Sequence, residues 1–293
     1  MRVTNYMLFD NAQIQTAAAR DRNFAAQQAV TTGVRVVHPG DDPAAAGIMV
    51  SYKMSLDRLT TIDKAVSRAD DELQVADSSL QSVSTLLARA RELTVQLGSD
   101  TYSASERANG AQEIRSISDQ IKQVMNSQVA GRYIFGGNVD RTPPFDAAGN
   151  YLGDTTTRQI EVSPGLVENS SIRADQVIKG VGGGVDVLGT LASIANALAS
   201  NDGPTLRGSI TNIQTAGDQV AAALTQTGSM LDAFRSAQTV GQAAKDSAQK
   251  VLASETEVDI FDAASTLAAA QQGLEATLNV VAKSFQLNLL KYL

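Results

Sequence analysis

The chain contains few residues that could carry out chemistry. It has no cysteine and a single histidine, His38, among 293 residues. A thiolate nucleophile is therefore excluded, and a histidine-based metal cluster cannot be built within one chain. His38 lies close to Asp41 and Asp42, but the surrounding Val-His-Pro-Gly-Asp-Asp-Pro is typical of a loop that leads into a helix cap. We interpret these residues as loop and cap, without a bound metal.

Three other patterns could bind or carry a small group. Four carboxylates between Glu255 and Asp262 lack the glycine and the spacing of a Ca²⁺ loop, so we expect a solvated break between helices. The glycines 182–184 have no Lys-Ser/Thr after them, and we expect a flexible connection there, not a phosphate loop. Asn169-Ser170-Ser171 fits a glycosylation pattern. Because we expect no secretory signal, we interpret this match as chance. The sequence predicts no cofactor and no enzymatic activity.

Composition and charge favour long helices and argue against nucleic acid. Aromatic residues make up 4% of the chain, tryptophan is absent, and the net charge is -7. Such a composition suits helices packed side by side better than one compact globule. An acidic chain without a basic tract is unsuited to binding nucleic acid. No apolar run approaches the roughly 18 residues of a membrane span, and polar residues interrupt the N-terminus. We therefore expect no membrane insertion and no cleavable signal peptide.

The last stretch, residues 259–293, predicts a helix that needs a partner. Alternating steps of four and three from Ile260 give a narrow coiled-coil seam. The other faces carry few charges, whereas a solvated helix usually carries many, so we expect burial in an assembly. The seam residues are Ile260, Ala264, Leu267, Gln271, Leu274, Leu278, Val281 and Phe285.

Residues 1 to about 33 predict a second helix of similar composition, with Ala17 on its apolar side. After it, Pro39-Gly40 breaks the chain, and Asp42-Pro43 offers an N-cap followed by proline at the first helical position. The predicted inter-domain loop and cap comprises Pro39, Gly40, Asp41, Asp42 and Pro43. The predicted assembly seam of both terminal helices comprises Met7, Ile14, Phe24, Ile260, Leu267, Leu274, Leu278, Val281 and Phe285.

The middle of the chain predicts helical rods. One helix from Pro43 to Leu97 has a regular seam, and Ser103 with Glu106 forms a capping box for an antiparallel third helix. Helix resumes at Asp186, and a long helix follows the turn at 202–204. The seam of the first rod helix is Ile62, Val66, Ala69, Leu73, Ala76, Leu80, Val83, Leu87, Ala90, Thr94 and Leu97, and that of the third helix is Ile114, Ile117, Ile121, Val124 and Gln128.

Residues 132–186 differ from the helical segments on either side. They contain β-branched residues, alternation in Thr156 to Val162, and Pro-Gly or Asn turns, which predict a small β-rich insert. We therefore expect three domains: an inner terminal coiled coil (1–42 and 255–293), a helical rod (43–131 and 187–254) and an outer insert (132–186).

Three stretches carry a family resemblance. The chain begins MRVTNYM and continues with TTGVRVVHPGDDPAAAG, followed by RARELTVQLGSDTYSASERANGAQEI with QVAGRYIFGGNVDRTPPF and YLGD, and it ends with FDAASTLAAAQQGLEATLNVVAKSFQLNLLKYL. Together they resemble the bacterial flagellar hook-associated protein 3 (FlgL-type) family of hook-filament junction proteins, a relative of flagellin. The chain departs from the family pattern at residues 36–38 and at Gly40, where serine is usual.

The resemblance implies a mainly α fold of the layered flagellin type, with long antiparallel rods, a terminal coiled coil and a small β-rich insert. It also implies an extracellular structural protein of the flagellum, exported by the flagellar type III apparatus with a chaperone. The implied partners are copies of the chain itself, another hook-associated protein on the hook side, and flagellin on the filament side. No cofactor is implied.

Two kinds of alternative stay open. Flagellin, the bulk filament subunit, usually has Asp-Asp-Ala-Ala-Gly where this chain has Asp41-Asp42-Pro43-Ala44-Ala45, and lacks the pattern Tyr133, Phe135, Gly137 with Pro144-Phe145. A signalling coiled coil would place its hairpin tip where this chain has the insert. A type III translocator would need a long apolar membrane segment, and no apolar run of this chain is long enough.

Overall fold

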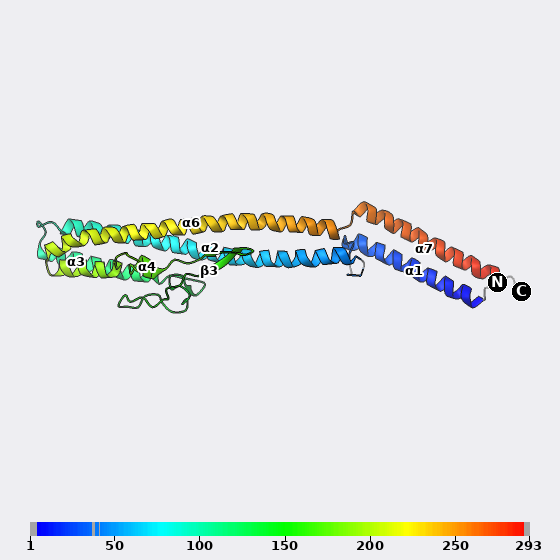
Figure 1. Cartoon of the computed structure of the whole chain (residues 1–293), viewed down its shortest axis with the longest axis horizontal. Coiled ribbons are helices and arrows are strands. Elements are labelled where there is room, and N and C mark those ends of the chain that lie inside the picture. The colour runs from blue at the N-terminus through cyan, green and yellow to red at the C-terminus, as the bar shows by residue number, and fades with distance from the viewer. Residues whose placement is uncertain (1–4, 37–38, 41, 290–293) are drawn as a thin grey trace. The chain divides into compact units, whose positions relative to one another are not determined.

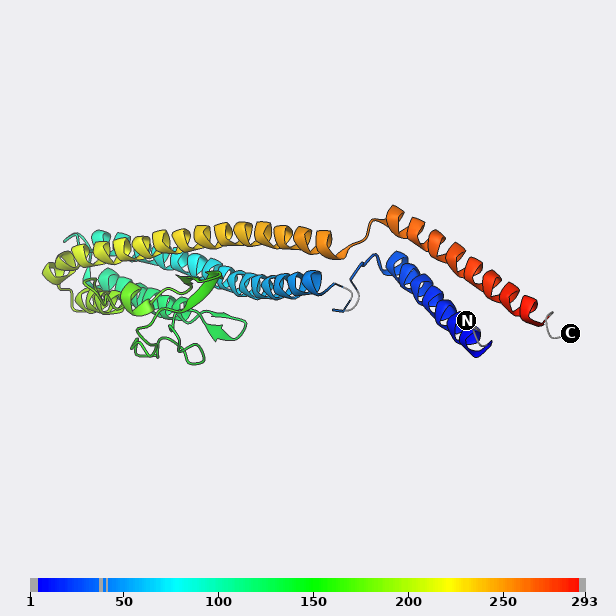
Figure 2. The same ribbon diagram turned by 45° about the vertical axis from the view of Figure 1, so that its right-hand side comes forward.

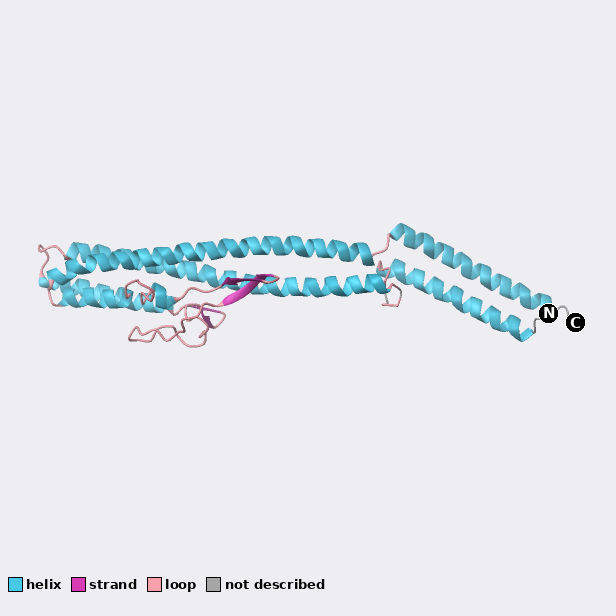
Figure 3. Ribbon diagram, in the orientation of Figure 1, coloured by secondary structure: helices cyan, strands magenta, loops and turns pink. Residues whose placement is uncertain are grey.

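The computed structural model describes residues 5–36, 39–40 and 42–289, and the chain divides into two compact units. We call residues 1–57 with 245–293 the terminal unit and residues 58–244 the rod unit. Helices α2 and α6 contribute to both units. The described chain is mainly helical (Figures 1 and 3). The helices are α1 (Asn5–Thr32), α2 (Pro43–Leu97), α3 (Ala104–Met125), α4 (Ala174–Val177), α5 (Val187–Ala199), α6 (Gly203–Thr256) and α7 (Ile260–Leu289).

Side-chain caps mark the starts of several of these helices, and those at Asp42 and Ser103 are predicted from the sequence. Asp42 Oδ1 accepts a hydrogen bond from Ala45 N at 3.1 Å, so α2 begins at Pro43 as expected. Ser103 and Glu106 form the predicted capping box of α3. Asp186 caps α5 through Gly189 N at 2.9 Å, and Asp259 caps α7 through Phe261 N at 2.8 Å.

The core of the rod unit is built on the predicted seam of α2. Every seam residue from Ile62 to Leu97 is buried, and the apolar ones form one cluster with the inner faces of α3, α5 and α6. Helices α3 and α5 contact each other, and α6 runs alongside α2 within this unit in both views (Figures 1 and 2). The seam predicted for α3 holds through Ile121. Its last position is wrong, because α3 ends at Met125 and Gln128 is an exposed residue of a strand.

Two antiparallel hairpins lie at the start of the insert and within it. Strands β1 (Gln128–Val129) and β2 (Arg132–Tyr133) pair across a turn in which Ala130 and Gly131 have φ of 49° and 78°, as two-residue hairpin turns require. Strands β3 (Gln159–Ser163) and β4 (Leu166–Asn169) form the second hairpin. Phe135, Phe145 and Ile178 of the insert are fully buried and belong to the same core as the rods. The insert is therefore packed into the rod unit's core.

The glycines 182–184 lie in a hydrogen-bonded turn. Gln219 of α6 accepts from Val185 N at 3.0 Å and donates to Val177 O at 2.6 Å. Gly182 and Gly183 have φ of 104° and 113°, which other residues rarely adopt. The connection expected to be flexible is thus fastened to α6 by one side chain.

A buried arginine holds the end of the rod unit where α2 turns into α3. Arg107 is only 5% exposed, and its guanidinium donates to Leu97 O at 3.1 Å, Ser99 O at 3.0 Å and Asn201 Oδ1 at 2.6 Å. The last carbonyls of a helix have no partner within the helix, so Arg107 supplies one. It also joins the α2–α3 turn to the α5–α6 turn.

Candidate assembly surface

Helices α1 and α7 of the terminal unit lie side by side and antiparallel, and they pack through small residues (Figures 1 and 2). The covered positions recur in steps of four and three on both helices. On α1 they are Ala12, Thr16, Ala19, Asn23 and Ala26, and on α7 they are Ala263, Leu267, Ala270, Leu274, Thr277, Val281 and Ser284. Small side chains let two helices approach closely but bury little apolar surface.

Several large apolar side chains of these helices stay exposed. Phe24 is 68% exposed and Phe261 is 86% exposed, and Val280 is exposed further along α7. Side chains of this size are normally covered in a monomeric soluble protein, and their exposure along a surface marks an interaction site. The pair therefore presents apolar surface that it does not itself use.

The structure brings only part of the predicted seam together. Leu267, Leu274 and Val281 face α1 and are half-buried. The other covered positions of α7 are Ala263, Ala270, Thr277 and Ser284. Each lies one residue before a position of the predicted seam. Of the predicted residues, Met7, Ile14, Phe24, Ile260 and Leu278 are exposed. Phe285 lies in α7, but its side chain is outside the described part, as is Asp41 of the predicted loop.

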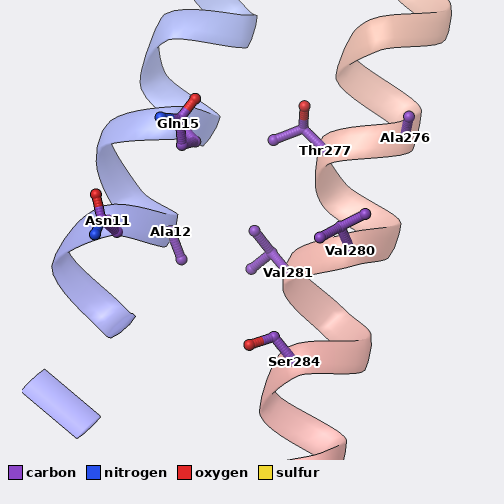
Figure 4. A pocket seen from close by; sticks show the side chains of 8 residues that line it. All are labelled: Asn11, Ala12, Gln15, Ala276, Thr277, Val280, Val281 and Ser284. Carbon is purple, nitrogen blue, oxygen red and sulfur yellow. The ribbon is translucent and has the colours of Figure 1, made fainter. Parts of the chain in front are cut away.

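A hollow of about 410 Å³ opens between α1 and α7 (Figure 4). Val280 and Val281 supply apolar lining from α7, and Asn11 and Gln15 supply amides from α1. The side chains on the two facing helices are too short to fill the space. Sequence periodicity could not reveal this hollow, since it requires the pairing of two distant helices.

A short backbone bridge joins the two connectors beside the helix pair. Arg35 N donates to Thr256 O at 2.7 Å, and Val258 N donates to Gly33 O at 3.0 Å. The Arg35 guanidinium lies 3.0 Å from both Asp42 Oδ2 and Glu255 O. Ala45 N–H and then Arg35 hold the pKa of the Asp42 carboxyl below its ordinary value of 3.8. Of the predicted loop and cap residues, Asp42 and Pro43 thus start α2, while Pro39 and Gly40 are exposed.

The terminal unit has a very small core. In its described part, the buried apolar side chains are five alanines and Val36. Burying one methyl or methylene group contributes only about 0.8 kcal/mol, whereas ordering each backbone residue costs about 1–2 kcal/mol. The unit therefore gains little from its own packing.

Neither a metal site nor a membrane span emerges from the described residues. No group of three or more His, Asp or Glu side chains there could hold a metal ion, and Glu255 to Asp262 form no such group. His38 lies outside those residues. No described helix is long and apolar enough to cross a bilayer.

The fold and the N-terminal part of the chain match known flagellar proteins. Residues 3–140 match the profile of the bacterial flagellin N-terminal helical region. Flagellar hook-associated protein 3 of Salmonella typhimurium is 29% identical over 171 residues, covering 57% of this chain and 54% of that protein. The chain thus spans about half the length of the curated relatives it matches. Flagellins are also among the relatives.

Solved structures show the same fold. Bacillus cereus FlgL superposes with a TM-score of 0.59 at 22% identity, over 69% of this chain and 99% of that one. The flagellar junction protein FlgL from Legionella pneumophila gives 0.54 at 14% identity, over 63% and 98%.

These findings define the class of protein first: over residues 3–140, slightly less than half of the chain, it resembles the bacterial flagellin family. Within it, the resemblance to hook-associated protein 3, FlgL, is confirmed. The mainly helical, flagellin-like fold expected from the sequence is confirmed as well.

Proposed function

We propose that this chain is a structural subunit of the junction between the flagellar hook and filament, and that it assembles through α1 and α7. The observation that carries the proposal is the uncovered apolar surface of the helix pair, including Met7, Ile14, Phe24, Ile260 and Leu278. Contact with similar helices of neighbouring subunits would remove these side chains from water, which is favourable.

The small core of the terminal unit supports the same proposal. A helix pair held by alanines and a few half-buried leucines depends on further packing to persist. Neighbouring subunits would supply that packing. The predicted inner coiled-coil domain, 1–42 with 255–293, would then be the part that orders in the assembly, and the insert at 132–186 would face outward.

The named relatives support a position within the flagellum. They include hook-associated protein 3 and a junction protein, so we place copies of this chain in one zone. Flagellin would lie on the filament side and another hook-associated protein on the hook side. The flagellar type III apparatus, with an export chaperone, would deliver the chain to this extracellular site. The second candidate is the bulk filament subunit, because flagellins are also relatives.

Deleting the gene distinguishes the two candidates. Cells that lack a junction subunit should complete their hooks and release flagellin into the medium, because exported flagellin finds no surface on which to polymerise. Cells that lack the flagellin itself should release no filament protein. We expect the first result, and purified parental filaments that consist mainly of this chain would overturn the proposal.

A further inference from the structure

A second hollow lies within the rod unit, between α2 and the insert. Its volume is about 280 Å³. Arg68 and Glu72 line it from α2, while Arg132 and Arg158 line it from the insert. A water molecule takes up about 30 Å³ in the liquid, so the hollow has room for a carboxylate side chain together with several waters.

Arginines outnumber carboxylates around this hollow. Glu72 Oε2 lies 2.9 Å from Arg158 Nη1, and Glu72 Oε1 lies 3.8 Å from Arg132 Nη1. Asp140 Oδ2, next to the hollow, lies 2.6 Å from Arg132 Nε. The cluster therefore contains three guanidinium groups and two carboxylates, and it carries one net positive charge.

Two of the arginines have donors to spare. Arg68 is exposed, and the acceptor within reach of its Nε is Lys64 O of its own helix, at 3.1 Å. The Arg158 side chain is 12% exposed, and its Nε is buried without a hydrogen-bond partner among the described residues. A guanidinium offers five N–H donors, and a carboxylate can accept from two at once. The cluster lacks an acceptor of the kind that a carboxylate supplies.

The charge of the chain indicates where that carboxylate comes from. With a net charge of -7, a second copy presents an excess of carboxylates, and the hollow is a positive site on an otherwise acidic protein. The ion pairs of Arg132 and Arg158 are explained by their fastening of the insert to α2. Arg68 takes no part in that fastening, so its place at the hollow is left without an internal explanation.

We propose that a carboxylate side chain of a second copy of this chain docks in this hollow, with Arg68 as its main contact. The inference rests on the proposed function, which places copies beside one another in one zone of the flagellum. It adds a polar contact between rod units to the apolar contacts of the terminal helices.

The test uses Arg68→Lys, which keeps the positive charge and introduces an amine that a carbodiimide can join to a touching carboxylate. Flagella isolated from cells carrying the variant would be treated with a water-soluble carbodiimide and separated by denaturing electrophoresis. Mass spectrometry of the dimer band would identify the joined peptides. Arg91→Lys, at an exposed arginine of α2 that does not line the hollow, is the matched control. The unsubstituted chain shows how much cross-linking arises from the native Lys64 nearby on α2.

We expect a band of twice the chain's mass in Arg68→Lys alone, in which the introduced lysine is joined to an aspartate or glutamate of another copy. Flagella that contain the variant but give no such band would overturn the proposal, as would cross-linking to a protein of different mass. Binding of inorganic phosphate to the purified chain that is lost in Arg68→Glu, without inter-copy cross-links, would assign the hollow to a free anion instead. Absence of the chain from isolated flagella would overturn the proposed function, and this contact with it.

Discussion

Replacing Leu278 by aspartate separates the stability of the free chain from that of the assembly. Leu278 is 43% exposed and lies beside the α1–α7 contact, so the free chain loses little when it is replaced. Exposed substitutions usually change the free energy of unfolding by less than about 0.5 kcal/mol. In the proposed assembly the same position faces a neighbouring subunit.

The cost in the assembly is much larger. Burying an unpaired carboxylate costs several kcal/mol, and the lost burial of leucine adds about 1.5–3 kcal/mol. Together these give at least about 4 kcal/mol per subunit, which weakens association roughly a thousand-fold or more, since each 1.4 kcal/mol is a factor of ten. Leu278→Asp should therefore be exported and folded but missing from isolated flagella.

The measurement combines circular dichroism melting of the purified variant with immunoblots of isolated flagella and culture medium. Leu166→Asp is the matched control, because Leu166 is 53% exposed on β4, outside the helix pair. It should be incorporated normally. Normal incorporation of Leu278→Asp, or an equal loss in both variants, would refute the reasoning.

Three further predictions concern the subunit alone. Arg107→Ala removes three charge-assisted hydrogen bonds from the end of the rod unit and should lower its free energy of unfolding by about 3 kcal/mol in urea titrations. The control Arg115→Ala, at an exposed arginine of α3, should change it by less than about 0.5 kcal/mol. Equal effects of the two variants would contradict the role assigned to Arg107. The pKa of Asp42 is lowered in the folded chain, so the stabilisation by its carboxylate should be fully present above the ordinary pKa of 3.8 and be lost as the pH falls through the lowered pKa. Asp42→Asn should therefore make the free energy of unfolding less sensitive to acid. An unchanged dependence of that free energy on pH would count against this role of Asp42. Amides of α1 and α7 in dilute subunit should exchange with deuterium much faster than those of α2 between Ile62 and Leu97, and equal protection would show that the terminal pair is stable without neighbours.

The helices were predictable because local signals define them. Caps at Asp42, Ser103, Asp186 and Asp259 fix where helices begin, and the seam of α2 reports which face is buried. The domain boundaries predicted around 42, 131, 187 and 255 stay predictions.

The packing of the terminal helices was not predictable from one helix at a time. Periodicity selected large residues such as Leu278, but α1 offers alanines, and the covered position falls one residue away, at Thr277. The bridge between Arg35 and Thr256 joins residues more than 200 positions apart, which no local pattern encodes. The burial of Phe135 and Phe145 in the rod core likewise depends on tertiary contacts.

The location of this chain on isolated flagella tests the central claim most directly. Gold-labelled antibody raised against the purified chain, viewed by electron microscopy, should mark one short zone between the hook and the filament, and the chain should amount to a small fraction of the flagellin present. Label along the whole filament would contradict the account and make the chain the filament subunit, and hooks and filaments without label at their junction would contradict it as well.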